Sequence, residues 1–184
     1  MRSKKLTNQE RGNAGEELTQ RMFNLQGTGG SGVGAYDKLD CKNKWIKAET
    51  KCTSKDYYQL SVEKFENWRF QAAQDRRQFF LHLIPESFGE PSWGYSLVVI
   101  SKGYFKALAP KDLDATHYFK YFEVNKSFKV EFGKLYPQKF WTEGEDRPET
   151  WTEGYWELAT PFGNLIVLRA PYFKELLEKD GQEE

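Results

Sequence analysis

Three residues of this 184-residue chain have the types and spacing of a hydrolytic centre, and they are Asp40, Glu49 and Lys51. Residues two apart in an extended strand share a face and lie roughly 6–7 Å apart at the backbone, so Glu49 and Lys51 point the same way. A hairpin can bring Asp40 beside Glu49, and two converging carboxylates repel each other unless a cation lies between them. We expect oxygen ligands of this kind to bind Mg²⁺, with Mn²⁺ as a substitute.

Such a group is suited to the hydrolysis of a phosphodiester bond. A metal ion held by Asp40 and Glu49 would polarise a phosphoryl oxygen and lower the pKa of a water molecule. Lys51 would orient that water or stabilise the charge that develops on the phosphate. The same three residue types also occur by chance as an ordinary surface salt bridge, so the surrounding elements must separate the two interpretations.

The apolar pattern predicts the elements that would position these residues. A helix is expected from about residue 8 to about residue 26, capped by Thr7 or Asn8 and ended by Gly27. The remaining elements follow from apolar alternation, caps and Gly or Pro stops. They are strands at 36–41 and 44–51, a helix after the N-cap Ser61, strands at 78–85 and 94–100, a helix at 102–108, two strands within 118–132, a strand at 165–168 and a helix from Pro171. This order predicts a mixed α/β fold.

Several short motifs keep a fixed order along the first half of the chain. They are Gly15-Glu16-Glu17-Leu18, Gly30-Ser31-Gly32, Lys38-Leu39-Asp40, Ala48-Glu49-Thr50-Lys51, Thr53-Ser54-Lys55 and Tyr58-Gln59-Leu60. This order resembles the PD-(D/E)xK nuclease superfamily, and in particular the small Holliday-junction-resolvase-like nucleases of archaea and phages. The resemblance covers about residues 10–105.

The resemblance implies an α/β fold with a restriction-endonuclease-like mixed β-sheet flanked by helices, formed by residues 1–110. Residues 111–184 are expected to form an aromatic, acidic β extension that packs on this core or continues it. The implied function is that of a Mg²⁺-dependent DNA endonuclease, with a Holliday junction or other branched DNA as a substrate. Symmetric cutting of a junction requires two active sites and therefore a homodimer.

Two positions of the implied site have competitors. Glu16 matches the family's spacing along the first helix, whereas Glu17 lies nearer the apolar stripe of that helix. We take Glu16 as the catalytic glutamate, which would hold the hydrolytic water, and keep Glu17 as the alternative. Asp37 competes with Asp40 as a metal ligand, because Leu39 stands where the family often has proline or glycine.

A glycine-rich segment at residues 27–34 is expected to be a loop. It is not a P-loop, because no Gly-Lys-Ser or Gly-Lys-Thr follows it. In a resolvase-like nuclease such a loop lies against a phosphate backbone, and Ser31 would donate a hydrogen bond to a phosphate. The other residues expected to contact nucleic acid are Lys55, Tyr58, Arg69, Arg76 and Arg77.

Charge is balanced over the whole chain but uneven along it. Residues 1–82 carry 15 Lys and Arg against 10 Asp and Glu, whereas residues 140–184 carry 4 against 11. The basic first part could meet a polyanion such as DNA. Its excess is modest, so charge alone does not distinguish a DNA-binding face from an ordinary solvated surface.

The remaining composition indicates a cytoplasmic protein. Cys41 and Cys52 are too few for a disulfide framework and are expected as buried thiols in a reducing environment. His82 lies within an apolar segment and is expected in a strand, which argues against a histidine-based zinc site. No apolar run approaches the roughly 20 residues that span a bilayer, and the basic first residues are not followed by the apolar segment of a secretory signal.

The alternative function is a non-catalytic binding module for nucleic acid or carbohydrate. It rests on the aromatic content of 16% and on Trp141, Trp151 and Trp156, which lie close to the two Thr-Glu-Gly segments. These rings could stack on bases or sugars, or they could pack a small second core. Dependence on a divalent metal distinguishes the nuclease from such a module.

Overall fold

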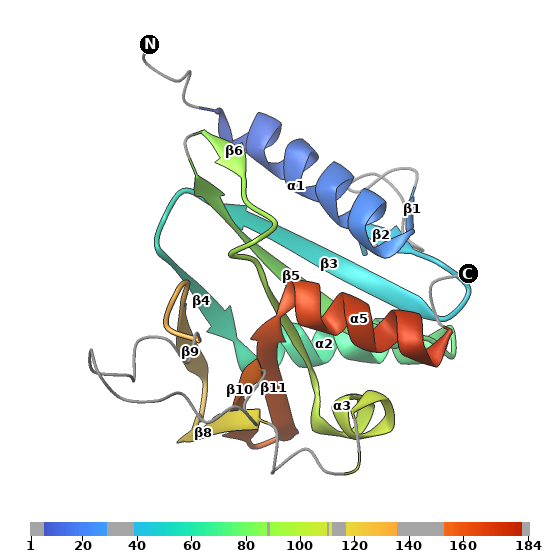
Figure 1. Cartoon of the computed structure of the whole chain (residues 1–184). Coiled ribbons are helices and arrows are strands. Elements are labelled where there is room, and N and C mark those ends of the chain that lie inside the picture. Colours follow the sequence, from blue (N-terminus) through green and yellow to red (C-terminus); the bar gives the residue numbers. More distant parts are fainter. Residues whose placement is uncertain are drawn as a thin grey trace.

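The computed structural model describes residues 6–28, 39–87, 89–109, 111, 117–135 and 153–181, and it shows a mixed α/β protein (Figure 1). The helices are α1 (Asn8–Phe23), α2 (Val62–Gln74), α3 (Lys102–Leu108) and α5 (Ala170–Asp180). The strands are β1 (Gln26–Gly27), β2 (Cys41–Lys42), β3 (Ile46–Thr53), β4 (Tyr57–Ser61), β5 (Gln78–Ser87), β6 (Glu90–Pro91), β7 (Leu97–Ser101), β8 (His117–Glu123), β9 (Ser127–Glu131), β10 (Glu153–Thr160) and β11 (Gly163–Arg169).

One mixed sheet runs through the molecule in the order β1-β2-β3-β5-β7-β11-β10-β8, with β6 added to β5. The pairs β3–β5 and β10–β8 are parallel, and the other pairs of this sheet are antiparallel. Strands β4 and β9 form a second, two-stranded antiparallel sheet. The strands of residues 117–169 therefore extend the sheet that begins with β1–β7.

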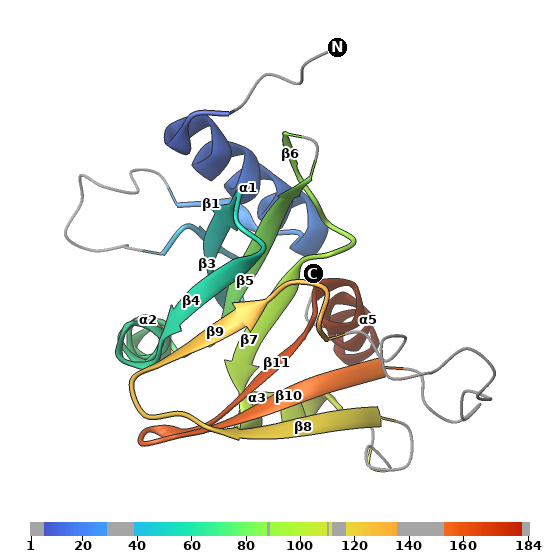
Figure 2. The same ribbon diagram turned by 90° about the vertical axis from the view of Figure 1, so that its left-hand side faces the viewer.

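Helices α1, α3 and α5 cover one face of the main sheet, and α2 covers the other face together with the β4–β9 pair (Figures 1 and 2). Each face has its own apolar core. Phe80 of β5 contacts Phe23 of α1 and Phe173 of α5 on the first face, with ring centres 4.8 and 5.1 Å apart. Phe79, the next residue, contacts Phe65 of α2 on the second face. This alternation follows from the period of two in a strand.

Helix α1 begins as the sequence predicts and ends earlier than predicted. Thr7 is its N-cap, with a capping box to Glu10. The predicted end at Gly27 is wrong, because Asn24 adopts the left-handed conformation at φ 49° and caps the helix itself. Residues 26 and 27 are then available to pair with β2. None of the helices in the described ranges is long and apolar enough to cross a lipid bilayer.

The later elements are partly as predicted. Ser61 caps α2, and the described ends of β5, β7, α3, β8, β9, β11 and α5 lie within a few residues of the expected elements. Four strands, β1, β4, β6 and β10, were not expected from the sequence. Of the predicted strand at 36–41, residues 36–38 lie outside the described part of the chain, and the strand that follows them is short.

Candidate functional site

Strand β3 presents Glu49 and Lys51 on the α2 face of the main sheet. Its neighbours in the sheet are β2 and β5, and the residues from Ile46 to Thr50 are all buried. Ile46 and Ala48 belong to the core under α1, so the alternating Glu49 and Lys51 point to the opposite face. The sequence pattern predicted this division of the strand.

Asp40 reaches the same place from the residue before β2. Cys41 pairs with Ala48 in the β2–β3 ladder, which sets Asp40 beside the middle of β3. The backbone N–H of Thr50 donates to Oδ2 of Asp40 at 2.8 Å. Asp40 is 8% exposed and Glu49 is 5% exposed, so two carboxylates are buried next to each other.

Lys51 forms an ion pair with Oε1 of Glu49. The second oxygen of Glu49, Oε2, is buried and has no hydrogen-bond partner among the described residues. A buried carboxylate oxygen without a donor is costly, because it has lost water and gained nothing in exchange. This oxygen therefore marks a place where a cation or a substrate group would be stabilising.

Electrostatics distinguish this pair from a second Lys–Glu pair of similar exposure. The side chains of Lys51 and Glu49 are 36% and 7% exposed, and those of Lys102 and Glu157 are 36% and 10% exposed. Burial and the nearby Asp40 raise the pKa of Glu49 to about 7. Burial also acts on Glu157, but hydrogen bonds from Lys102 and Asn164 hold its pKa below the ordinary value.

The difference between the two pairs has a physical cause. Glu157 has a lysine and an amide to neutralise and satisfy it, whereas Glu49 shares one lysine with a second carboxylate. Burial raises the pKa of Asp40 as well, although the Thr50 N–H and Lys51 act against that rise. Two carboxylates with raised pKa values indicate a site that is short of positive charge.

Helix α1 adds Glu16 to this group. Burial and the charge of Asp40 raise the pKa of Glu16, and Lys51 acts in the opposite direction. Glu17 is exposed on the same helix, while Glu16 is half-buried. Glu16 thus lies within electrostatic range of Asp40, Glu49 and Lys51, and it is more buried than Glu17.

Two aromatic residues lie near Lys51 on the α2 face. Its Nζ atom lies 5.5 Å from the centre of the Trp68 ring on α2. Tyr58 of β4 is half-buried beside the same lysine, and burial together with Glu49 raises the pKa of its hydroxyl against the influence of Lys51. Nothing in the sequence indicates that the Trp68 ring would lie under Lys51.

The donor set fits a divalent cation of the magnesium type. Such an ion takes oxygen ligands, usually one or two carboxylates, and completes its shell with water and substrate phosphate. Asp40 and Glu49 supply two carboxylates, and Oε2 of Glu49 lacks a donor among the described residues. Within the same residues, no group of three or more His, Cys, Asp or Glu side chains is placed to hold a metal ion.

A hydroxyl network fixes β3 from its other face. Thr50 donates from Oγ1 to Oγ1 of Thr19 at 2.9 Å, and Thr19 donates to the carbonyl of Gly15 at 3.0 Å. Nδ1 of His82 lies 2.7 Å from the same Thr19 oxygen. Burial lowers the pKa of His82 to about 3, so its ring is neutral.

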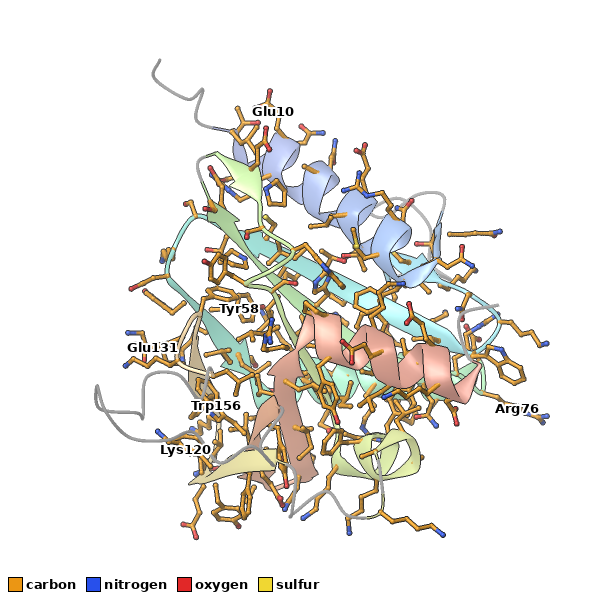
Figure 3. All side chains as sticks on the ribbon, in the orientation of Figure 1. Glu10, Tyr58, Arg76, Lys120, Glu131 and Trp156 are labelled. Carbon is orange, nitrogen blue, oxygen red and sulfur yellow. The ribbon has the colours of Figure 1, made fainter. Side chains whose placement is uncertain are left out.

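The residues predicted to contact nucleic acid are dispersed. Lys55 is exposed over the Tyr57 ring, 5.3 Å from its centre, next to Tyr58. Arg69 is held by Glu66 on α2, at 2.7 and 2.9 Å. Figure 3 shows Arg76 on the side of the molecule away from Tyr58.

Arg77 has a structural partner near Arg76. Its Nε atom donates to the carbonyl of Asn43 at 2.6 Å and so ties the end of α2 to the turn before β3. Ser31 and Asp37 lie outside the described residues. The group around Lys51 therefore includes Tyr58 and has Lys55 close by in the chain, whereas Arg76 and Arg77 lie elsewhere.

Of the tryptophans on which the alternative function rests, the structure describes Trp156, and of the two cysteines Cys41 is buried and Cys52 is half-buried. Trp156 is 5% exposed, and Trp141 and Trp151 lie outside the described residues. Burial raises the pKa of Cys41 to about 12 and that of Cys52 to about 11, so both thiols stay protonated at neutral pH. Both are free cysteines.

Comparisons with protein-family models, with curated protein sequences and with solved structures found no match to this chain.

Proposed function

We propose that this chain is a divalent-metal-dependent DNA endonuclease that hydrolyses phosphodiester bonds, with the restriction-endonuclease-like fold of the PD-(D/E)xK superfamily that its motifs resemble. One observation carries the proposal. Asp40 and Glu49 are buried side by side with a single lysine, and Oε2 of Glu49 has no hydrogen-bond partner in the described part of the chain. A Mg²⁺ or Mn²⁺ ion would satisfy this oxygen and offset the repulsion between the carboxylates.

Each residue of the group then has a role in hydrolysis. Asp40 and Glu49 would hold the ion, which when bound supplies Lewis-acid polarisation of the scissile phosphate. Lys51 would stabilise the charge that develops on the phosphate, and Trp68 would keep its ammonium group in place. Glu16, with its raised pKa, would hold the attacking water and accept its proton.

The substrate belongs to the same proposal. Branched DNA such as a Holliday junction is favoured by the resemblance of the motif order to resolvase-like nucleases. Paired incisions across a junction need two copies of the site, so the enzyme would act as a homodimer. The cleavage test therefore compares a junction, a flap and a linear duplex.

The proposal is tested by cleavage of end-labelled DNA in Mg²⁺ or Mn²⁺. Wild type, Asp40→Asn, Glu49→Gln and Lys51→Ala are each given a four-way junction, a flap, a linear duplex and a single strand. We expect wild type to cut and each variant to lose at least about 100-fold in rate, since each removes a ligand or a charge-stabilising group. EDTA is expected to abolish cutting by wild type.

Matched controls are available in the chain. Glu157→Gln and Lys102→Ala break a Lys–Glu pair of similar exposure at a distance from the site, and Glu17→Gln changes the exposed neighbour of Glu16. These variants are expected to cut at the wild-type rate. If wild type cuts none of the substrates, or if Glu49→Gln cuts as fast as Glu157→Gln, the nuclease proposal is wrong and a non-catalytic binding module becomes the better interpretation.

A further inference from the structure

A pocket of about 450 Å³ lies away from the carboxylate group, where β8, β9 and β10 meet. Its volume is within the range of small-molecule sites, roughly 300–1,000 Å³. The residues that line it are Lys120, Phe122, Phe128, Lys129, Glu131, Lys134 and Trp156. The proposed hydrolysis uses none of them.

The floor of this pocket is aromatic. The ring centres of Phe122 on β8 and Phe128 on β9 are 4.9 Å apart. The centre of the Trp156 ring on β10 lies 5.8 Å from that of Phe122 and 6.0 Å from that of Phe128. Trp156 is buried, whereas both phenylalanines are half-buried and keep part of their rings accessible. Three rings in mutual contact make a firm platform for a flat, apolar group.

The rim of the pocket is basic. Three lysines line it against one acidic residue, Glu131. Lys129 and Lys134 are both exposed and share that one carboxylate, at 3.5 and 2.8 Å. Two lysines on one carboxylate leave an excess of positive charge, which would attract a phosphate. An aromatic floor with a lysine rim suits a nucleotide, which has a flat base and an anionic phosphate.

The pocket and the carboxylate group lie on the same face of the main sheet. Tyr58, beside Lys51, is paired with Val130 in the β4–β9 ladder, so the two side chains point the same way. Phe128 lies two residues before Val130 on that same side, and all three pack on the core under α2. Figure 3 shows Tyr58, Glu131, Trp156 and Lys120 following one another along one side of the molecule.

We propose that this pocket binds one unpaired nucleotide of a DNA strand, with its base on Phe122 and Phe128 and its phosphate on Lys129 and Lys134. The strand would continue past Tyr58 toward Lys51, and this last step rests on the proposed nuclease function. An unpaired nucleotide occurs in a flap or in a single strand, and it is absent from a continuous duplex. The pocket thus gives the protein a preference for DNA with unpaired bases.

Binding is measured by fluorescence anisotropy of a labelled short oligothymidylate and of a blunt duplex of the same length, in EDTA so that no cleavage occurs. The double variant Lys129→Gln/Lys134→Gln changes exposed side chains and leaves the core intact. We expect it to weaken single-strand binding at least about fivefold, to flatten its salt dependence, and to leave duplex binding unchanged. Phe122→Leu is expected to weaken single-strand binding to a similar degree by removing the stacking surface.

Lys126→Gln is the matched control, because Lys126 is an exposed lysine in the turn between β8 and β9 and does not line the pocket. It is expected to bind as wild type does. The proposal is wrong if Lys126→Gln weakens single-strand binding as much as the double variant does, or if the double variant binds the strand as wild type does. It is also wrong if thymidine monophosphate binds as tightly as the strand.

The two proposals fail in different ways. Glu49→Gln is expected to bind the single strand normally in EDTA while it loses cleavage, so the binding test stands even if the protein cuts nothing. If wild type cuts DNA but the pocket variants bind single strands normally, the nucleotide pocket alone is wrong.

Discussion

The ammonium group of Lys51 lies over the indole ring of Trp68, with Nζ 5.5 Å from the ring centre, while it is also paired with Glu49. The contact joins a strand residue of the candidate site to a helix on the other side of the core. A cation over an aromatic face is stabilised by about 0.5–2 kcal/mol. Trp68 is thus expected to hold the lysine in the position where it meets the substrate.

Trp68→Leu is expected to slow DNA cleavage by about 2- to 30-fold, which corresponds to the loss of that contact. The measurement is the single-turnover cleavage rate in Mg²⁺. Trp45→Leu is the control, because it removes a similar contact outside this group. Nζ of Lys44 lies 4.4 Å from the centre of the exposed Trp45 ring. Equal rates for the two variants would remove Trp68 from the site.

Binding of Mn²⁺ is expected to weaken as the pH falls below about 7. Glu49, with its pKa raised to about 7, is largely protonated below that pH, and an ion must displace the proton to bind. The affinity then falls about tenfold for each pH unit per displaced proton. Titration calorimetry at about pH 6 and about pH 8 in buffers of different ionisation enthalpy measures both the affinity and the released proton.

Glu49→Gln is expected to bind Mn²⁺ weakly and with little pH dependence, and Glu17→Gln to behave as wild type. A wild-type affinity that stays constant across this pH range would contradict the assignment of Glu49 as a ligand.

The buried His82 is expected to make the free energy of unfolding depend on pH. Its pKa is 6.5 in an unfolded chain and about 3 in the folded protein, so the unfolded state binds more protons between these values. The contribution of His82 to the free energy of unfolding is complete above pH 6.5. It is lost as the pH falls, by about 1.4 kcal/mol for each pH unit. The raised pKa values of Asp40 and Glu49 act in the opposite direction, so a comparison of variants is needed.

Urea unfolding of wild type and His82→Gln at about pH 4 and about pH 7 isolates this effect, because the carboxylates are common to both proteins. Wild type is expected to lose more stability than His82→Gln on acidification. Equal losses would show that His82 does not titrate as a buried group.

Gly15 sets the distance between α1 and β3. A Cβ atom at this position would lie 2.9 Å from Cβ of Cys52 and 3.4 Å from Cγ2 of Thr50. Gly15→Ala is therefore expected to push the helix outward, to lower the free energy of unfolding by about 1–3 kcal/mol, and to displace Glu16 from its neighbours. Both thermal unfolding and the cleavage rate measure the effect.

Gly12→Ala in the same helix is the matched control, because nothing lies within 4 Å of a Cβ atom there. It is expected to stabilise the protein by about 0.5–1 kcal/mol, as alanine does in a helix interior. If Gly15→Ala were as stable as Gly12→Ala, the close approach at Gly15 would not determine the position of α1.

The local parts of the site could be predicted from the sequence. A period of two on β3 assigns Glu49 and Lys51 to one face, and a cap with an apolar stripe predicts α2. What could not be predicted depends on distant pairing. The bond from the Thr50 N–H to Asp40 needs the β2–β3 register, and the place of Trp68 under Lys51 needs the packing of α2 on the sheet.

The dependence on distant pairing also explains why β4 and β10 were not predicted. Residues 57–61 follow a turn and precede a helix, and they become β4 because residues 127–131 pair with them from far along the chain. Glu153 and Gly154 end the second Trp-Thr-Glu-Gly, which indicates a turn, yet they begin β10 and pair with His117 and Tyr118 of β8. Pairings of this kind depend on tertiary context rather than local propensity.

The place of β11 between β7 and β10 has a consequence for synthesis of the protein on the ribosome. Glu16, Asp40, Glu49 and Lys51 are all translated early, but β4 gains its partner only when residues 127–131 emerge, and β7 gains its second neighbour only when residues 163–169 emerge. Until then the nascent chain carries an open apolar sheet edge, which is prone to aggregate. Folding of the candidate site is thus coupled to completion of the chain, and a fragment that stops near residue 110 is expected to need a chaperone rather than to fold alone.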